Sequence, residues 1–299
     1  MKIAAFSPSS PPDSAKMQGG IELLRRLLST ASITCFSKDE ATAPFSYLAQ
    51  EDTEQAQLFQ HLMTTDEIDL VWAMRGGYGS LRWLTHVDWH ALAHAPRKNP
   101  LMGFSDVTFL HSALLNLHWP VLIHGPLLTT LIKTDTPSIE AVKRLLIHHE
   151  PPSLLGQPLL AGTARGHLIG GNLTCLLHTL GTTFEPPWDQ AILVIEDHNE
   201  ALYRIDRMLT HLRLADRLSR LAGIAVGEIL HTGIDEQQLK ALLLDRLQDL
   251  GIPVIWNLPV GHGTRNMPFI LGMKYEIQGE TGELRPYSRI SIELPPAGP

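Results

Sequence analysis

The sequence has few cysteines and no long apolar run. Its two cysteines, Cys35 and Cys175, lie far apart and match no metal-binding spacing, which argues against a disulfide framework. The first apolar run, 3–6, is too short for a signal-peptide core, and no stretch approaches the ~18 apolar residues that a membrane helix needs. These absences predict a cytoplasmic protein without a membrane anchor.

Basic runs are also missing. The chain has 24 Lys and Arg against 31 Asp and Glu, a formal net charge of −7 with histidine neutral. Nucleic acids and anionic membranes attract clustered basic residues, so neither is expected as a partner. Hydrophobic residues make up 44% and charged residues 18%, which predicts a folded protein. A length of 299 residues favours two domains.

The first half alternates short buried strands with helices. Apolar runs predict strands, and helical spacing of apolar residues predicts helices, at the following positions: strands at 2–6, 68–74 and 100–104, and helices at 20–28, from 81 onward, at 107–117 and at 139–147. Strands that alternate with helices predict an α/β fold whose N-terminal sheet is mostly parallel and doubly wound.

A proline-rich change of composition near 150–160 predicts a linker. We therefore expect an N-terminal α/β domain at 1–150 and a second, mixed α/β domain at 160–299. The second half contains a predicted Gly-rich loop at 170–172, strands at 191–195, 224–226 and 253–258, and a helix around 205–212. No repeat of fixed period is visible.

Ser105 stands where the predicted strand 100–104 gives way to a helix. A sharp bend exposes a side chain at this position, and the helix N-terminus favours negative charge, so the serine is well placed as a nucleophile. Serine is also a common helix N-cap, and the position alone does not exclude that role.

The glycines of 75–79 follow another strand and allow backbone amides to turn toward an anion or oxyanion. The spacing matches neither common nucleotide-phosphate motif, and a plain turn that needs positive φ is an equal alternative.

Two further side-chain types stand at predicted strand ends in the second half. Glu196 and Asp197 follow the apolar strand 191–195. They are either catalytic groups or carboxylates that face the dipole of the following helix. His262 lies between two glycines after the strand 253–258 and is the best general-base candidate among 15 histidines. The chain order Ser105, Glu196, His262 supplies a nucleophile, an orienting carboxylate and a base.

Two other groups of residues are weaker candidates for a functional site. His86, His90 and His94 have the spacing of one helical face, but no carboxylate or cysteine completes a metal site, and we expect no metal. Cys175 has leucine neighbours that favour a buried core position over a thiol nucleophile.

Read together, the motifs resemble the LD-carboxypeptidases, serine peptidases that trim murein peptides and include the microcin C self-immunity peptidase. The matching segments lie at 74–79, 103–108, 124–126, 170–173, 196–197 with 203–209, and 261–263 with Asn266. The resemblance implies Ser105 as nucleophile, Glu196 as orienting carboxylate and His262 as general base and acid. It also implies an oxyanion hole from the amides of Gly77 and Asp106, a cleft between two domains, a homodimer, and no metal or other cofactor.

The resemblance and the constellation together predict a serine carboxypeptidase that releases the terminal D-alanine from a cytoplasmic murein tetrapeptide during peptidoglycan recycling. Such an enzyme must recognise the free carboxylate of its substrate, for which Arg75 is the candidate. Two alternatives remain open at this point. The same triad could cleave peptidyl nucleotides of the microcin type, or the chain could be a non-catalytic module that binds anionic peptides.

Overall fold

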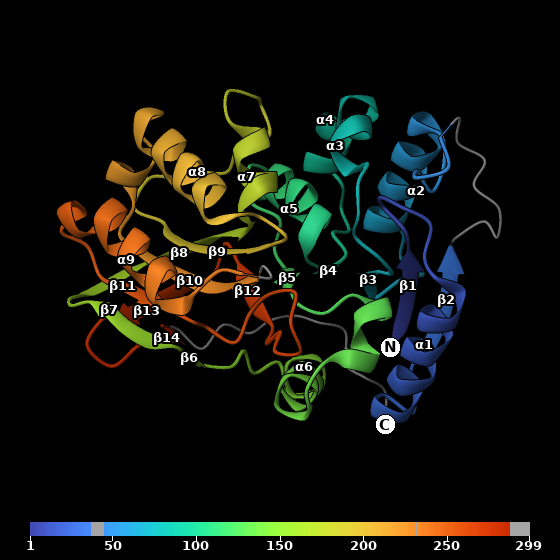
Figure 1. Cartoon of the computed structure of the whole chain (residues 1–299). Helices are drawn as coiled ribbons and strands as arrows, with labels where there is room; N and C mark the ends of the chain where they lie inside the picture. Colours follow the sequence, from blue (N-terminus) through green and yellow to red (C-terminus); the bar gives the residue numbers. More distant parts are fainter. Residues whose placement is uncertain (37–44, 231–232, 288–299) are drawn as a thin grey trace.

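The computed structural model describes residues 1–36, 45–230 and 233–287, which form two β-sheets surrounded by helices (Figure 1). The six-stranded sheet has the order β12-β5-β4-β3-β1-β2, and the eight-stranded sheet has the order β6-β14-β13-β8-β9-β10-β11-β7. None of the helices in these ranges is long and apolar enough to cross a membrane.

The six-stranded sheet is parallel except at one edge. Its strands are β1 (Lys2–Phe6), β2 (Ser32–Phe36), β3 (Leu70–Ala73), β4 (Leu101–Gly103), β5 (Leu122–His124) and the antiparallel β12 (Phe269–Leu271). The order 2-1-3-4-5 is that of a doubly wound sheet, in which ligands bind outside the carboxyl ends of the strands near the β1/β3 switch point. The mostly parallel N-terminal sheet predicted from the sequence is thus confirmed.

The first part of the chain contributes short and long helices. Their bounds are α1 (Ser14–Leu27), α2 (Asp52–Thr64), α3 (Ser80–Trp83), η1 (Leu84–His86), α4 (Trp89–Ala93), η2 (Ser105–Val107), α5 (Thr108–Leu115), η3 (Leu128–Lys133) and α6 (Thr136–His148). Helix α1 begins six residues before the predicted start at 20, because the Asp13 side chain accepts a hydrogen bond from the Lys16 N–H and caps it.

The eight-stranded sheet is mixed. It contains β6 (Leu154–Leu155), β7 (Gln157–Leu160), β8 (Thr163–Asn172), β9 (Ile192–His198), β10 (Gly223–Leu230), β11 (Val254–Trp256), β13 (Lys274–Gln278) and β14 (Glu283–Pro286), of which β8 to β11 run parallel. Its helices are α7 (Leu173–Thr179), α8 (Leu202–Leu214), η4 (Leu218–Arg220), α9 (Glu236–Leu247) and η5 (Gln248–Leu250). This sheet confirms the predicted mixed α/β second part.

The predicted Gly-rich loop at 170–172 is wrong, because these residues form the end of β8. A Cβ on Gly170 would lie 1.8 Å from the Val194 carbonyl oxygen of β9. The glycine is therefore needed for close strand pairing. Strand β9 continues to His198, so Glu196 and Asp197 lie within a strand instead of after one.

Strand β12 links the two parts of the structure. It follows the His262 segment in sequence, yet it pairs with β5 of the six-stranded sheet (Figure 1). The division into domains 1–150 and 160–299 stays a prediction, and the pairing of β12 shows that the later residues also complete the first sheet.

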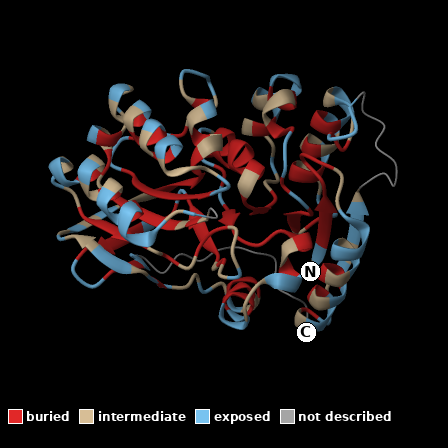
Figure 2. Cartoon of the chain, viewed as in Figure 1, coloured by how far each residue is buried: buried red, intermediate tan, exposed pale blue. Residues whose placement is uncertain are grey.

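Buried residues occupy the sheets and the inward faces of the helices, while exposed residues line the outside (Figure 2). Strands β3, β4 and β5 are buried throughout, as are four of the five residues of β1. Burial on both faces explains why these strands are continuous apolar runs without alternation.

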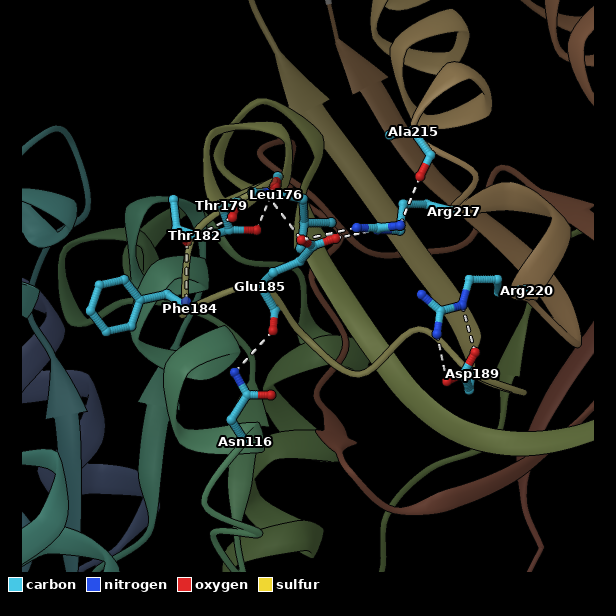
Figure 3. A network of polar contacts seen from close by, with 11 residues as sticks. Asn116, Leu176, Thr179, Thr182, Phe184, Glu185, Asp189, Ala215, Arg217 and Arg220 are labelled. Carbon is cyan, nitrogen blue, oxygen red and sulfur yellow. Dashed lines mark hydrogen bonds and ion pairs between the residues drawn. The ribbon is translucent and has the colours of Figure 1, made fainter.

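Polar contacts hold the connection between α7 and β9 (Figure 3). The Arg217 guanidinium binds the Glu185 carboxylate, and Arg220 binds Asp189 through two hydrogen bonds of 2.6 and 2.7 Å. The side-chain amide of Asn116, next to α5, donates to the Glu185 carbonyl at 2.9 Å. These contacts fix the entry to β9, the strand that carries Glu196.

Candidate active site

Ser105 lies at the bend between β4 and η2, at the carboxyl end of the six-stranded sheet. Its φ of 64° is in the left-handed region, which costs a non-glycine residue about 1–3 kcal/mol and persists where the surroundings hold it. Gly103 permits the bend, because a Cβ there would lie 2.9 Å from Val107 and 3.0 Å from Ala73. The tight packing presents the Ser105 hydroxyl at the strand end.

His262 and Glu196 join Ser105 in a line of hydrogen bonds. The His262 Nε2 lies 3.1 Å from the Ser105 Oγ, and its Nδ1 lies 2.6 Å from the Glu196 Oε2. A carboxylate accepts hydrogen bonds, so Nδ1 carries the proton and Nε2 is free to accept from the hydroxyl. Glu196 is fully buried, and the His262 side chain is 18% exposed.

The carboxylate controls the charge of the imidazole. Burial alone would lower the pKa of His262, but the charge and hydrogen bond of Glu196 outweigh burial and raise that pKa above its ordinary value. Among the described residues, His262 is the hydrogen-bond partner of Glu196, whose other oxygen has none. The Glu196 carboxylate therefore holds the imidazole through Nδ1.

Two aromatic rings hold the His262 ring from the sides. The His198 ring stacks on it with a centroid distance of 5.1 Å, and the Phe104 ring lies at 4.7 Å. Partial burial and the nearby His262 lower the pKa of His198. Of the two stacked rings, His262 therefore takes up a proton before His198 does.

The loop that carries His262 is fastened by Glu228 of β10. One Glu228 oxygen accepts from the Gly263 N–H at 3.0 Å, and the other accepts from the Arg265 Nε at 2.9 Å. Gly261 has a φ of 148°, and a Cβ there would lie 3.0 Å from the Glu228 Cβ. The glycines next to His262 thus permit the close approach of β10.

The proposed oxyanion-hole residues lie beside Ser105. A Cβ on Gly76 would come 3.0 Å from the Ser105 Oγ and 3.5 Å from the Asp106 nitrogen, so both atoms lie beside the open side of Gly76. Gly77, with a φ of 112°, lines the same cavity. Its role and that of the Asp106 amide as donors to an oxyanion stay predictions.

The Asp106 side chain points away from the cavity and joins three segments. Its Oδ2 accepts from the Ser9 hydroxyl at 2.6 Å and from the Ser80 N–H at 2.8 Å. Burial raises the pKa of this carboxyl, and the hydrogen bonds oppose the rise. The loops after β1, β3 and β4 are thereby tied together under the serine.

Ser105 and His262 open into a cavity of about 780 Å³ that both parts of the structure line. Arg75, the predicted carboxylate partner, is in the lining, and its Nη1 donates to the Pro11 carbonyl at 2.7 Å. The remaining polar lining comes from the following residues: Asp13, Lys16, Thr129, Thr130, Lys133, Asn172, Thr174, Asp197, His198, Asn199 and Glu200.

Asp197 has a structural role that its neighbour Glu196 lacks. It accepts from the Thr174 N–H at 2.9 Å, the Thr174 hydroxyl at 2.8 Å and the His198 N–H at 2.7 Å. It therefore binds the first turn of α7, close to the helix-dipole alternative suggested by the sequence.

Several residues that line the cavity were not predicted from the sequence as part of the site. Lys133 and His198 carry no local motif, although His198 directly follows the two carboxylates. Cys175 packs against the hydrophobic core as predicted, and it also lines the cavity because it is only partly buried. The described ranges contain no group of three or more His, Cys, Asp or Glu side chains placed to hold a metal; the His90 and His94 rings lie 4.3 Å apart.

The fold and the site together indicate the class of protein. A hydroxyl at a strained bend, hydrogen-bonded to an imidazole that a buried carboxylate orients, is the arrangement that hydrolases with a serine nucleophile use. Family models match residues 3–125 as an LD-carboxypeptidase N-terminal domain and residues 165–277 as an LD-carboxypeptidase C-terminal domain. The chain belongs to the LD-carboxypeptidase family of serine peptidases.

Relatives agree with this assignment over nearly the whole chain. A putative carboxypeptidase of Synechocystis is 36% identical, over 95% of this chain and 93% of the relative. The murein tetrapeptide carboxypeptidase of Pseudomonas aeruginosa is 32% identical, over 93% of each chain.

Solved structures share the fold. The muramoyltetrapeptide carboxypeptidase from Oxalobacter formigenes matches with a TM-score of 0.83 and 24% identity, over 95% of this chain and 97% of the other. The microcin C7 self-immunity protein matches with a TM-score of 0.80 and 20% identity, over 97% of each chain. The predicted family resemblance is confirmed.

Proposed function

We propose that this protein is a serine carboxypeptidase that releases the terminal D-alanine from a murein tetrapeptide, with Ser105, His262 and Glu196 as its catalytic triad. The observation that carries the proposal is the hydrogen-bonded line of these three side chains at the wall of a cavity large enough for a short peptide. The match to a murein tetrapeptide carboxypeptidase supports the choice of substrate.

The reaction begins when the Ser105 Oγ attacks the carbonyl carbon between the diamino acid and D-alanine, and the hydroxyl proton passes to the His262 Nε2. The Gly77 and Asp106 amides donate to the developing oxyanion. Each such donor is worth about 3 kcal/mol of transition-state stabilisation. Glu196 stabilises the imidazolium through Nδ1.

His262 then gives its proton to the amine of the leaving D-alanine, which leaves an ester on Ser105. Water attacks this ester while Nε2 takes one of its protons, and the shortened peptide departs when that proton returns to the Ser105 oxygen. Every proton is thus carried by one imidazole nitrogen.

The cavity offers groups to a zwitterionic peptide. Lys16, Arg75 and Lys133 supply positive charge from the first part of the chain, whereas Glu200 supplies negative charge from the segment after β9. A murein peptide with a diamino acid carries carboxylates as well as an ammonium group. A cavity lined by groups of both signs can therefore orient it. We also propose that the enzyme acts in the cytoplasm as a homodimer, as the family resemblance implies.

The test is mass-spectrometric product analysis. The purified protein is incubated with a murein tetrapeptide that ends in D-alanine and with its all-L counterpart, and Ser105→Ala serves as the control. Release of D-alanine from the first substrate by the wild type is expected, with none from the variant. Release that persists in Ser105→Ala would remove the serine from the mechanism.

A peptidyl nucleotide is the competing substrate, because the microcin self-immunity protein shares the fold. Incubating both substrates side by side decides between them. Labelling of Ser105 by a serine-directed covalent probe tests the remaining alternative of a non-catalytic binding module.

A further inference from the structure

Three cationic side chains among the described residues line the cavity, and they are not equivalent. The Arg75 guanidinium binds the Pro11 carbonyl, and Lys16 lies on the exposed side of α1. The Lys133 Nζ instead donates to the backbone carbonyl of His262 at 2.6 Å. Lys133 is therefore the cation that the fold attaches to the general base.

The proposed chemistry fixes which side of Ser105 the leaving residue occupies. His262 must protonate the leaving amine, so the amino acid that departs lies against His262. Its carboxyl carbon is about 2.5 Å from its nitrogen, by standard bond lengths and angles. A cation that recognises this carboxylate must therefore lie within reach of the same histidine, where Lys133 is held.

The Lys133 ammonium has N–H donors that the described residues do not use. It carries three N–H bonds, of which the His262 carbonyl takes one, and no carboxylate among the described residues lies within ion-pair distance of it. Partial burial lowers the pKa of Lys133, Glu228 opposes this effect, and Lys16 adds to it. A bound carboxylate would stabilise the charged form.

The backbone around Lys133 is firmly placed. Lys133 ends η3, and Thr129 of η3 donates both its N–H (3.0 Å) and its hydroxyl (2.8 Å) to the Met74 carbonyl at the end of β3. Gly20 allows α1 to pack on η3, because a Cβ there would lie 2.0 Å from the Leu128 oxygen.

The residues after Lys133 bind the loop of His262 directly. The Asp135 N–H donates to the Thr264 carbonyl at 2.8 Å, and the Asn266 N–H donates to the Ser138 hydroxyl at 3.1 Å. Together with the hydrogen bond from Lys133 to the His262 carbonyl, these contacts connect residues 133–138 to residues 262–266. Such support is what a recognition group needs for a fixed geometry.

We propose that Lys133 binds the terminal carboxylate of the leaving amino acid and thereby restricts the enzyme to removal of a single C-terminal residue. This inference rests on the proposed function and assigns the role first expected of Arg75 to a different cation. Lys133 is a specificity-determining residue here, because it contacts the part of the substrate that departs.

The experiment measures binding apart from cleavage. In the Ser105→Ala background, calorimetry compares a murein tetrapeptide that ends in free D-alanine with the same peptide that ends in D-alaninamide. Lys133→Gln keeps a donor for the His262 carbonyl and removes the charge, Lys133→Arg keeps the charge, and Lys274→Gln on β13 is the matched control for charge loss elsewhere.

We expect the peptide with the free carboxylate to bind more tightly than the amide. Lys133→Gln should lower the affinity for the free acid about ten- to 100-fold, the range for hydrogen bonds to a charged group. Binding of the amide should stay within about twofold, and Lys133→Arg and Lys274→Gln should keep the preference. Equal losses for acid and amide would mean that Lys133 only supports the loop, and would overturn the proposal, as would unchanged binding or no binding of either peptide.

The two proposals fail separately. A Lys133-dependent preference for the acid, in a protein whose wild type releases no D-alanine, would keep Lys133 as the group that binds the terminal carboxylate and reject the proposed function. Release of D-alanine with no effect of Lys133→Gln on acid binding would do the reverse.

Discussion

The Ser105 side chain lies directly against the open face of Gly76. A Cβ at residue 76 would come 3.0 Å from both the Cβ and the Oγ of Ser105. The loop after β3 and the bend after β4 are therefore matched in shape, and the first prediction follows from this contact.

Gly76→Ala should lower kcat about 100-fold, because the added methyl group displaces the Ser105 hydroxyl from His262, and displacements of about 1 Å have effects of this size. The melting temperature should change little, since Gly76 faces the cavity. Steady-state kinetics and thermal unfolding on the same preparation check both parts. Full activity of the variant would show that the hydroxyl tolerates the shift.

The raised pKa of His262 predicts the pH profile. The general base must be neutral to accept a proton, so kcat/KM should rise with pH through a pKa above the ordinary ~6.5 of histidine. The measurement is kcat/KM for the tetrapeptide across this range. An acidic limb at or below pH 6.5 would contradict the expected effect of Glu196.

Glu196→Gln should reduce kcat about 10³- to 10⁴-fold, by analogy with loss of the orienting carboxylate in other triads. It should also move the acidic limb of the residual activity to lower pH, because the negative charge that raises the pKa of His262 is gone. A variant with lower activity but an unshifted limb would show that another group sets the pKa.

The sequence predicted the three side chains of the proposed triad, which the structure brings into hydrogen-bonding distance, better than their surroundings. Ser105 could be found because a strand, a serine and a helix follow one another locally. Lys133 could not be found, because its link to His262 joins residues 129 positions apart and depends on how η3 packs on α1. The loop predicted at 170–172 is wrong, because sequence alone does not distinguish a glycine turn from glycines that permit close strand pairing.

The hydrogen bond between Thr108 and Asn172 tests the contact between helix α5 and strand β8. The Asn172 N–H donates to the Thr108 hydroxyl at 3.0 Å, and both residues are buried. Thr108→Val should destabilise the protein by about 1–3 kcal/mol, because it leaves that N–H without an acceptor. Urea unfolding measures the loss. Thr108→Ser keeps the hydroxyl and should retain more of the stability than Thr108→Val.

The ion pair of Arg217 with Glu185 (Figure 3) predicts a stability change at low pH. Burial would raise the pKa of Glu185, but the hydrogen bonds from Arg217 and the Gly181 N–H, together with the charge of Arg217, outweigh burial and lower it. The contribution of Glu185 is therefore fully present above the unfolded value of ~4.3 and is lost as the pH falls through the lower folded-state pKa.

Glu185→Gln should cost about 1–3 kcal/mol at neutral pH, the range for a hydrogen bond between charged groups, and the difference from wild type should shrink toward pH 3. Denaturant unfolding at several pH values gives the comparison. A difference that stays constant with pH would show that the charge of Glu185 contributes nothing.

The pairing of β12 with β5 has a consequence for experiments that divide the gene. A fragment that stops near residue 150 would lack β12 and would present the unpaired edge of β5 to other molecules, which favours aggregation. Expressed apart, the two pieces are expected to be insoluble or to recombine through the pairing of β5 with β12.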